Sequence, residues 1–446
     1  MRRTALAAMA AALAAPPALA DEPSSAWAIP AEGACVEAAR TALDDDAPPG
    51  PPLPGDVITS ESASRLAGYL PPELWKYRER FFYDGMRMEI GPCFRDYSPP
   101  AFFREATGKL AGQVVLTPDG RLEGYRAGLP FPPEGIDPND PRAGLRWAWN
   151  RASAWRGGGR YGDFRISIVS PQGTAESWEG DSFLALLGGR ADRAGHGYRA
   201  SASSEAEWAA GGTCRNVKTG NRASFRQYAT GERRADLFVG TSGMRRIQRV
   251  TAPDAEGALH AFLVDASIGG GLFAHGGVPH LHEWKVRAVR DMLAPINTTR
   301  DTFPVDETRN FGPWGISFAS DRWELRRVLV LEGRLKEGHF EDGATRYVWY
   351  VDLQTLRPLY YASYRARGDA AGIGYFVSRW SEDREDYPAW PDDAARPVRS
   401  LDVVGEAWVD WNDQHAVRIE LGDTVSVPPP DRKLNRMISL SSVRIR

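Results

Sequence analysis

The stretch Tyr347-Val348-Trp349-Tyr350-Val351 is followed by Asp352-Leu353-Gln354-Thr355 and then by Pro358 to Tyr364. The first and last parts are rich in aromatic and β-branched residues, which favour strands. An Asp at the entrance of a turn can accept a hydrogen bond from its own backbone two residues on. These residues therefore predict a β-hairpin.

Similar stretches lie on both sides of this hairpin. Arg367-Gly368-Asp369 offers a second turn that leads into Ile373 to Val377. Short runs that alternate apolar and polar residues are typical of half-buried strands. Further runs of this kind are Met86 to Ile90, Arg165 to Val169 and Trp323 to Leu335. The fold class predicted is mainly β (α+β), with a large antiparallel sheet.

Helical patterns are fewer. Thr59 or Ser60 could cap a helix that runs from Glu61 to Leu70 and ends at Pro71-Pro72, since proline cannot continue a helix. The other predicted helices are Glu73 to Phe82, Leu145 to Trp155 and His282 to Met292. We expect residues 56–446 to form a single large β-rich domain.

The N-terminal end has the pattern of a signal peptide. Arg2 and Arg3 precede the apolar stretch Thr4 to Leu13, and Ala18-Leu19-Ala20 matches the site that signal peptidase cuts. We expect residues 1–20 to be removed and the protein to reside in the periplasm. No cysteine stands at the cut, so a lipoprotein is not expected. Residues 21–55, rich in acidic residues and proline, predict an irregular arm.

The charge balance and the cysteines indicate which binding partners and which disulfide to expect. The 446 residues include 55 Lys and Arg against 58 Asp and Glu, a balance that does not indicate a nucleic-acid partner. An oxidising compartment permits a disulfide among Cys35, Cys93 and Cys214. We expect Cys35–Cys93, which would tie the arm to the body; three free thiols are the alternative.

No motif for catalysis or for a cofactor is present. The sequence contains no G-x-S-x-G, Walker or dinucleotide-binding pattern, so we expect neither a catalytic residue nor a cofactor. His275, His280, His282 and Glu283 are the best metal candidates, because imidazoles this close in sequence can share an ion. Their spacing fits no known motif, and ordinary loop histidines, with no metal, are the preferred interpretation.

Several stretches occur in a specific order. They are Pro54-Gly55-Asp56-Val57-Ile58-Thr59, Gly128-Leu129-Pro130-Phe131-Pro132, Trp147 to Asn150, Arg322 to Val328, and Arg346 to Arg365 with Arg367-Gly368 after it. This ordered set resembles the bacterial family called domain of unknown function 1329, described as outer-membrane lipoprotein-sorting-like proteins. The resemblance covers roughly residues 54 to 380.

The resemblance implies a strongly bent antiparallel sheet, an unclosed barrel with a few helices packed on it, as in Lol-type lipoprotein carriers. It also implies hydrophobic transport together with an inner-membrane resistance–nodulation–division transporter and an outer-membrane protein. No catalytic residue carries over from the resemblance. The hypothesis that follows is a periplasmic carrier for a lipid or other hydrophobic compound.

Candidate ligand-binding residues are apolar or aromatic side chains of the predicted strands and of the helix near residue 150. They are Trp147, Trp149, Trp323, Leu325, Leu329, Trp349, Tyr361 and Phe376. The opposite strand faces remain an alternative, because a shift of one residue exchanges the two faces. Arg322, Arg326 and Arg327 are candidates for binding a head group or a protein partner.

Two other functions remain open. One is a non-catalytic structural or assembly component of the envelope that binds protein partners through sheet edges. The other is a hydrolase with an unrecognised site, which would need a nucleophile and a base close together in a cleft. A large apolar void would favour the carrier, and a filled interior would favour the structural component.

Overall fold

The computed structural model describes most of the chain downstream of residue 49. The described residues are 27–36, 50–186, 191, 206–214, 222–228, 236–240, 247–250, 279–300, 309–336, 344–365, 368, 370–390, 398–410, 415–422, 425–427, 432 and 436. The predicted signal peptide, most of the predicted arm, His275 and the turn residues Arg367 and Asp369 lie outside them. No helix in the described ranges is long and apolar enough to cross a membrane.

Strands dominate the described chain. They are β1 (Val57–Ile58), β2 (Met88–Ile90), β3 (Val115–Leu116), β4 (Leu122–Glu123), β5 (Gly159–Ser170), β6 (Gly173–Leu186), β7 (Ala206–Cys214), β8 (Arg222–Tyr228), β9 (Asp236–Gly240), β10 (Gln248–Val250), β11 (His282–Ala294), β12 (Arg322–Leu335), β13 (Ala344–Asp352), β14 (Pro358–Arg365), β15 (Ala370–Trp380), β16 (Leu401–Asp410) and β17 (Ala416–Leu421). The α-helices are α2 (Pro72–Lys76), α3 (Ala101–Leu110) and α4 (Ala143–Ala152), and the short 3-10 helices are η2 (Ala63–Tyr69), η3 (Arg78–Arg80), η4 (Ala111–Gln113), η5 (Pro133–Gly135), η8 (Pro279–Leu281) and η9 (Ser381–Asp383).

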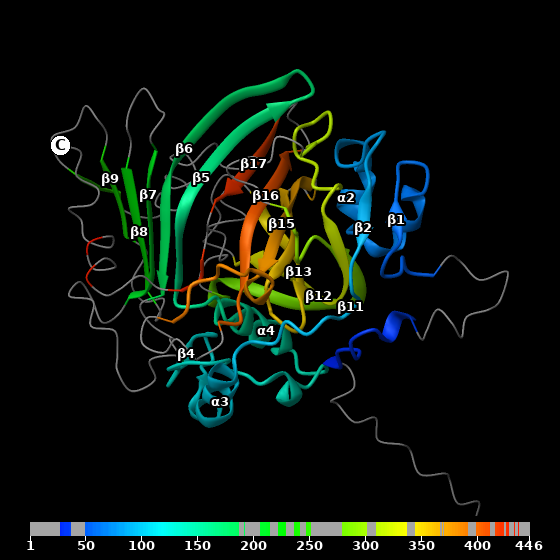
Figure 1. The fold of residues 1–446 in the computed structure, drawn as a ribbon. Helices are drawn as coiled ribbons and strands as arrows, with labels where there is room; N and C mark the ends of the chain where they lie inside the picture. The colour runs from blue at the N-terminus through cyan, green and yellow to red at the C-terminus, as the bar shows by residue number, and fades with distance from the viewer. Residues whose placement is uncertain are drawn as a thin grey trace, which may run out of the picture.

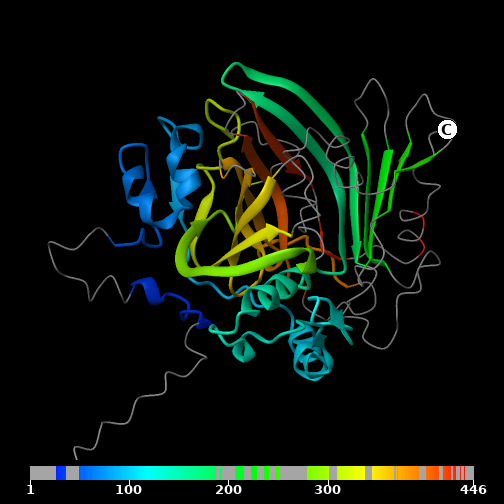
Figure 2. The ribbon, with the colours of Figure 1, turned by 180° about the vertical axis from the view of Figure 1, so that it is seen from behind.

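One large sheet organises the fold (Figure 1). Its order is β1-β2-β12-β13-β14-β15-β16-β17-β5-β6-β7-β8-β9-β10, and β11 also pairs with β12. Strands β11 to β16 follow one another along the chain, whereas β17 returns to pair with β5, from Ala416 opposite Val169 to Leu421 opposite Phe164. In both views β1 and β2 lie at one end of the sheet and the strands around β8 lie at the other. Figure 2 shows the same arrangement from behind, with β5 and β6 as a long curved hairpin. The mainly β, unclosed fold is as predicted.

The hairpin predicted over residues 347–364 is confirmed as β13 and β14. Asp352 fixes its turn, because one carboxylate oxygen accepts hydrogen bonds from the backbone N–H and the hydroxyl of Thr355, both at 2.8 Å. Trp349 lies opposite Tyr361, and Tyr350 lies opposite Tyr360. The alternation therefore sends Trp349 and Tyr361 to one face of the sheet and Tyr350 and Tyr360 to the other.

Both faces of the central strands are covered. We call the face that meets α4 the α4 face; its buried cluster includes Trp147, Trp284, Leu329, Leu331, Trp349, Tyr361, Phe376, Trp408, Val417 and Ile419. We call the other the N-terminal face, because residues 58–97 and 311–319 pack on it. Its buried cluster includes Leu74, Tyr97, Ile316, Phe318, Val328, Tyr350, Tyr360, Tyr375 and Ala407.

The predicted helix over His282 to Met292 is wrong, because these residues belong to β11. A shift in register between Val286 and Ala288 interrupts the strand alternation and leaves Arg287 without an opposite residue on β12. Such a bulge displaces the later apolar side chains by one position, so their spacing imitates a helix. The helix α3 was not predicted; it begins directly after Pro99-Pro100, and Phe103 and Ala106 are its buried residues.

Other predicted elements differ in detail. The sheet contains one parallel pair, β2 with β12, in which Trp323 lies opposite Ile90. The segment predicted as a helix from Glu61 to Leu70 forms η2, and the next one contains α2 and η3. Prolines and a lack of continuous apolar periodicity explain why these helices stay short.

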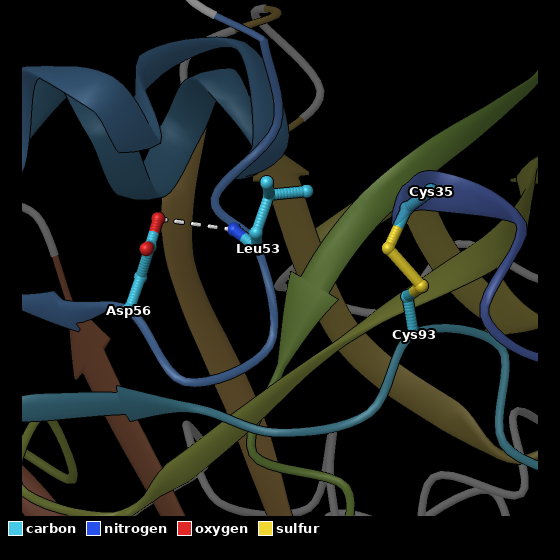
Figure 3. The surroundings of a disulfide bond; sticks show 4 residues. All are labelled: Cys35, Leu53, Asp56 and Cys93. Carbon is cyan, nitrogen blue, oxygen red and sulfur yellow. Dashed lines mark hydrogen bonds between the residues drawn. A yellow bond between two sulfur atoms is a disulfide. The ribbon is translucent and has the colours of Figure 1, made fainter. Parts of the chain in front are cut away.

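A disulfide joins Cys35 to Cys93, which is the pairing expected from the sequence. Figure 3 shows this bond beside the turn at Leu53, where the N–H of Leu53 donates to Asp56 at 3.1 Å. The N–H of Gly33 also donates to the carbonyl of Cys93 at 3.0 Å. The bridge thus fastens residues 27–36 to the segment that follows β2.

Candidate functional site

The helix α4 packs on the α4 face over β11 and β12. It begins after Asp140, whose carboxylate accepts the N–H of Arg142 at 2.7 Å and pairs with Arg146 at 3.0 Å. Trp147 and Arg151 are four residues apart, so both point from one side of the helix. Gly144 allows a close approach to β11, since a Cβ atom there would lie 2.5 Å from the carbonyl oxygen of Trp284.

Polar contacts hold α4 in place at its C-terminal half. The side chain of Asn150 accepts a hydrogen bond from the N–H of Phe131 at 3.0 Å and donates to the carbonyl of the same residue. The indole N–H of Trp149 donates to the carbonyl of Gly120 at 2.9 Å. Trp27 packs edge-on against Trp147, with ring centroids 5.2 Å apart. The helix is therefore attached by a small set of identifiable contacts.

Stacked aromatic rings cross the α4 face from strand to strand. We call Trp349, Tyr361 and Trp408 the aromatic ladder. Trp349 and Tyr361 stack with centroids 5.4 Å apart, and Tyr361 and Trp408 stack at 4.8 Å. Phe376 packs beside Tyr361 at 5.5 Å. This arrangement gives a wide apolar surface that spans β13 to β16.

Two polar groups are embedded in this surface. The hydroxyl of Tyr361 donates to Glu406 at 2.9 Å, and burial together with the charge of Glu406 raises the pKa of Tyr361 well above its usual value. Tyr361 is therefore a neutral hydrogen-bond donor at physiological pH.

Arg151 is the second polar group, and it is only 1% exposed. Its guanidinium lies over the ring of Trp349, 4.3 Å from the centroid. Among the described residues, neither its Nε nor its Nη2 has a hydrogen-bond partner, and burial lowers its pKa to about 10. A buried unpaired charge is destabilising by several kcal/mol, and a desolvated cation–π contact, which contributes about 2 kcal/mol or somewhat more, offsets only part of that cost.

The structure divides seven of the eight candidate ligand-binding residues between the two faces. Five belong to the buried cluster of the α4 face: Trp147, Leu329, Trp349, Tyr361 and Phe376. Trp323 and Leu325 belong to the cluster of the N-terminal face, and Trp149 points toward Gly120. All eight are at most 4% exposed, so in this conformation solvent does not reach them. Their role in ligand binding stays a prediction.

The three arginines proposed for a head group all make ion pairs within the chain. Arg326 is buried and donates to Asp352 at 2.8 Å, and Arg327 donates to Asp291 at 2.6 Å. Arg322 lies 3.7 Å from Glu324, and its Nη2 lies 3.6 Å from Asp383. Their positive charges are thus largely balanced by neighbouring carboxylates.

Sequence reasoning missed Trp408, Glu406 and Arg151 on the α4 face. Trp408 and Glu406 lie on β16, a strand that the alternation patterns did not identify. Arg151 follows Trp147 by four residues on a helix that was predicted, so this spacing was the signal available. An arginine on a short helix is usually solvent-exposed, which explains the omission.

The structure describes three of the four metal candidates, His280, His282 and Glu283. His280 lies in η8 and His282 begins β11, and both are buried. The ring of His282 packs 5.4 Å from Trp284 and 6.2 Å from Tyr347, and Glu283 is exposed. Within the described ranges, no three histidine, cysteine or acidic side chains are grouped as a metal site requires.

The model of the family named protein of unknown function (DUF1329) matches residues 57–378, well over half of the chain. The chain belongs to the DUF1329 family. No curated protein matches it.

Solved structures similar to this DUF1329 protein are distant in sequence. A DUF1329 family protein from Desulfovibrio piger is 13% identical with a TM-score of 0.44, covering 68% of this chain and 100% of that one. A putative outer membrane lipoprotein-sorting protein domain from Vibrio parahaemolyticus is 12% identical with a TM-score of 0.39, covering 67% and 99%. A LolA superfamily protein from Nitrosomonas europaea is 11% identical with a TM-score of 0.33, covering 67% and 97%.

The stretches that carried the family resemblance build junctions of the fold. In the first of them, Asp56 binds the N–H of Leu53 and pairs with Arg65 at 2.7 Å. In the second, Leu129 donates its N–H to Thr107 of α3 at 2.9 Å, and Phe131 makes the contacts to α4 described above. The second stretch therefore positions α3 and α4, and through α4 the guanidinium of Arg151 over Trp349.

Proposed function

We propose that this DUF1329 protein is a non-catalytic periplasmic carrier that holds a lipid or another hydrophobic compound on its α4 face. The observation that carries the proposal is the aromatic ladder, a continuous apolar surface across four strands with Arg151 of α4 over its first ring, Trp349. In this proposal α4 lifts from the sheet and the cargo enters between the helix and the ladder. We further propose that the cargo passes between an inner-membrane resistance–nodulation–division transporter and an outer-membrane protein.

Burial of the cargo supplies enough free energy for such a mechanism. A sixteen-carbon chain gains roughly 12 kcal/mol gross at about 0.8 kcal/mol for each methylene. Ordering the chain and moving α4 reduce that gain. The three hydrogen bonds that Asn150 and Trp149 make contribute roughly 1 kcal/mol each, so displacing α4 is compatible with net binding.

The closed packing of the same face favours a second candidate. Because the five predicted residues on this face are at most 4% exposed, the protein could instead be a structural or assembly component of the envelope with a filled interior. Such a component would bind protein partners and no stoichiometric lipid.

Native mass spectrometry of the protein purified from the periplasm, followed by organic extraction, separates the two candidates. The carrier predicts a co-purifying hydrophobic compound near one per chain, and an assembly component predicts a clean apo mass that persists when lipids are offered. Trp349→Ala should lower the occupancy strongly. Tyr350→Ala is the matched control, because the neighbouring residue on the same strand faces the N-terminal side and donates to Glu73 at 2.7 Å.

A similar loss of occupancy in both variants would indicate a general effect of destabilisation and would count against the α4 face. Large-to-small changes at both positions should lower the stability by comparable amounts, about 3–5 kcal/mol. Chemical unfolding of each variant therefore accompanies the occupancy measurement.

A further inference from the structure

The α4 face contains hydrogen-bond donors for which no acceptor is found in the part of the chain that the structure describes. The Nε and Nη2 atoms of Arg151 and the indole N–H groups of Trp147 and Trp408 are all buried and unpartnered there. All three residues are at most 4% exposed. Their side chains supply only donors, and one of them is a permanent cation.

The three residues are linked through the aromatic ladder. Arg151 lies over Trp349, which stacks on Tyr361, and Tyr361 stacks on Trp408. Trp147 precedes Arg151 by one helical turn on the same side of α4. The unsatisfied donors therefore mark the apolar surface proposed for the cargo.

The described surroundings of Arg151 provide no carboxylate that balances its positive charge. Asp352, the buried carboxylate at the end of β13, is already paired with Arg326 at 2.8 Å. Glu406 accepts the hydroxyl of Tyr361, and no acidic side chain of the described ranges lies within ion-pair distance of Arg151. Burial without a countercharge favours loss of the proton, and the pKa of Arg151 is lowered accordingly.

We propose that Arg151 binds the anionic head group of an amphiphilic cargo whose alkyl tail lies along Trp349, Tyr361 and Trp408. This inference rests on the proposed carrier function and defines its cargo as a carboxylate or phosphate amphiphile. A planar guanidinium matches both groups, because its N–H donors can bind two oxygens of either. The anion supplies the countercharge that Arg151 lacks, and the ladder supplies the apolar contact.

Isothermal titration calorimetry with three twelve-carbon probes tests the inference on the intact mature protein. The probes are dodecanoate, dodecyl phosphate and dodecan-1-ol, which share one tail and differ in the head group. Dodecanoate or dodecyl phosphate, or both, should bind the native protein more tightly than dodecan-1-ol. The tighter of the two anions identifies a fatty-acid-like or a phospholipid-like source.

The variant Arg151→Met should weaken binding of the favoured anion by roughly 10- to 100-fold and leave binding of dodecan-1-ol within twofold. Arg151→Lys keeps the charge but not the fork, and it should give an intermediate affinity. Arg146→Met is the matched control: Arg146 lies on the same helix, pairs with Asp140 at 3.0 Å and is partly exposed. It should leave all three affinities unchanged.

Thermal unfolding of the ligand-free proteins gives a second readout. Removing an unpaired buried charge should leave the melting temperature of Arg151→Met equal to or above that of the native protein. A clearly lower melting temperature would reveal a countercharge within the chain and overturn the inference.

The binding outcomes separate the inference from the function on which it rests. If all three probes bind equally and Arg151→Met changes nothing, the head-group role fails while the carrier function stands. If none of the three binds, the carrier function and the inference fail together.

Discussion

The hydroxyl of Tyr97 lies within hydrogen-bond distance of both carboxylate oxygens of Glu324, at 2.9 and 2.7 Å. Glu324 is fully buried on β12, and burial raises its pKa from the ordinary 4.5 to about 7, against the opposing effects of Tyr97 and the nearby Arg326. The folded protein therefore binds a proton at this site more tightly than the unfolded chain does. The contribution of Glu324 to stability is complete below pH 4.5 and is lost as the pH rises to about 7.

Glu324→Gln should remove this pH dependence. The amide keeps an acceptor for Tyr97 but has no charge to bury, so the variant should match the native protein near pH 4. Above pH 7 it should be more stable by up to roughly 3 kcal/mol, the equivalent of the shift in pKa. Urea unfolding of both proteins between pH 4 and pH 8 measures the difference.

Glu332 lies on the same strand as Glu324 and should change the stability with pH in the opposite direction. Burial alone would raise its pKa, but hydrogen bonds from Arg287, Arg334 and Arg346 lower it below the ordinary value. Its contribution is therefore present at neutral pH and disappears as the pH falls through the lowered pKa. Glu332→Gln should lose stability at pH 7 and not at acidic pH; parallel curves for the two variants would contradict both assignments.

The neighbouring residues Arg326 and Arg327 should respond very differently to replacement by methionine. Arg326 and Asp352 are each 1% exposed, so Arg326→Met leaves a buried carboxylate without its cation and should destabilise the protein by about 3–5 kcal/mol. Arg327 and Asp291 are 27% and 32% exposed, and Arg327→Met should cost less than about 1 kcal/mol.

Chemical unfolding distinguishes these two changes. Adding Asp352→Asn to Arg326→Met should recover part of the loss, because the unpaired charge is then gone. If the double variant is as unstable as the sum of both single variants, the pair is not coupled in the way that the 2.8 Å contact indicates.

Local patterns in the sequence predicted those strand pairings that join residues close together along the chain. The hairpin of β13 and β14 was found because its alternation and its Asp352 turn lie within about twenty residues. The pairing of β17 with β5 joins segments about 250 residues apart, from Ala416 opposite Val169, and no local pattern reports it. The bulge at Arg287 produced a false helix because a shifted strand and a helix can share the same apolar spacing.

The candidate site was predicted only in part for a related reason. Alternation separated the two faces correctly in the middle of the hairpin, where Trp349 and Tyr361 share the α4 face. It failed near the start of β12, where the N–H of Phe94 binds the carbonyl of Leu325 at 2.9 Å. There the segment after β2 covers the strand, so Trp323 and Leu325 join the cluster of the N-terminal face.

Loss of the disulfide should destabilise the protein and loosen the cover of the α4 face. Cys35 and Cys93 are 58 residues apart, and closing a loop of that length stabilises by about 4 kcal/mol in the chain-entropy model. The same segment carries Trp27, which packs on Trp147 and donates to the carbonyl of Ile136 at 2.7 Å. Cys35→Ala with Cys93→Ala should therefore speed hydrogen exchange in α4.

Reductant provides the control for this prediction. Dithiothreitol should lower the stability of the native protein in urea toward that of the double variant and leave the variant itself unaffected. A native protein that unfolds at the same urea concentration with and without reductant would show that the bridge contributes nothing.

Two glycines in helices of equal length should respond to alanine in opposite ways. A Cβ at Gly144 would lie 2.5 Å from the carbonyl oxygen of Trp284, so Gly144→Ala must push α4 away from β11 and destabilise the protein by roughly 1–3 kcal/mol. A Cβ at Gly108 of α3 meets nothing within 4 Å, and Gly108→Ala should stabilise by up to about 1 kcal/mol. Thermal unfolding compares the two variants.

If α4 is the movable cover, Gly144→Ala should also raise the association rate of the favoured twelve-carbon probe, whereas Gly108→Ala should not. Stopped-flow fluorescence measures both rates. Equal rates in the two variants would show that α4 does not control access to the ladder.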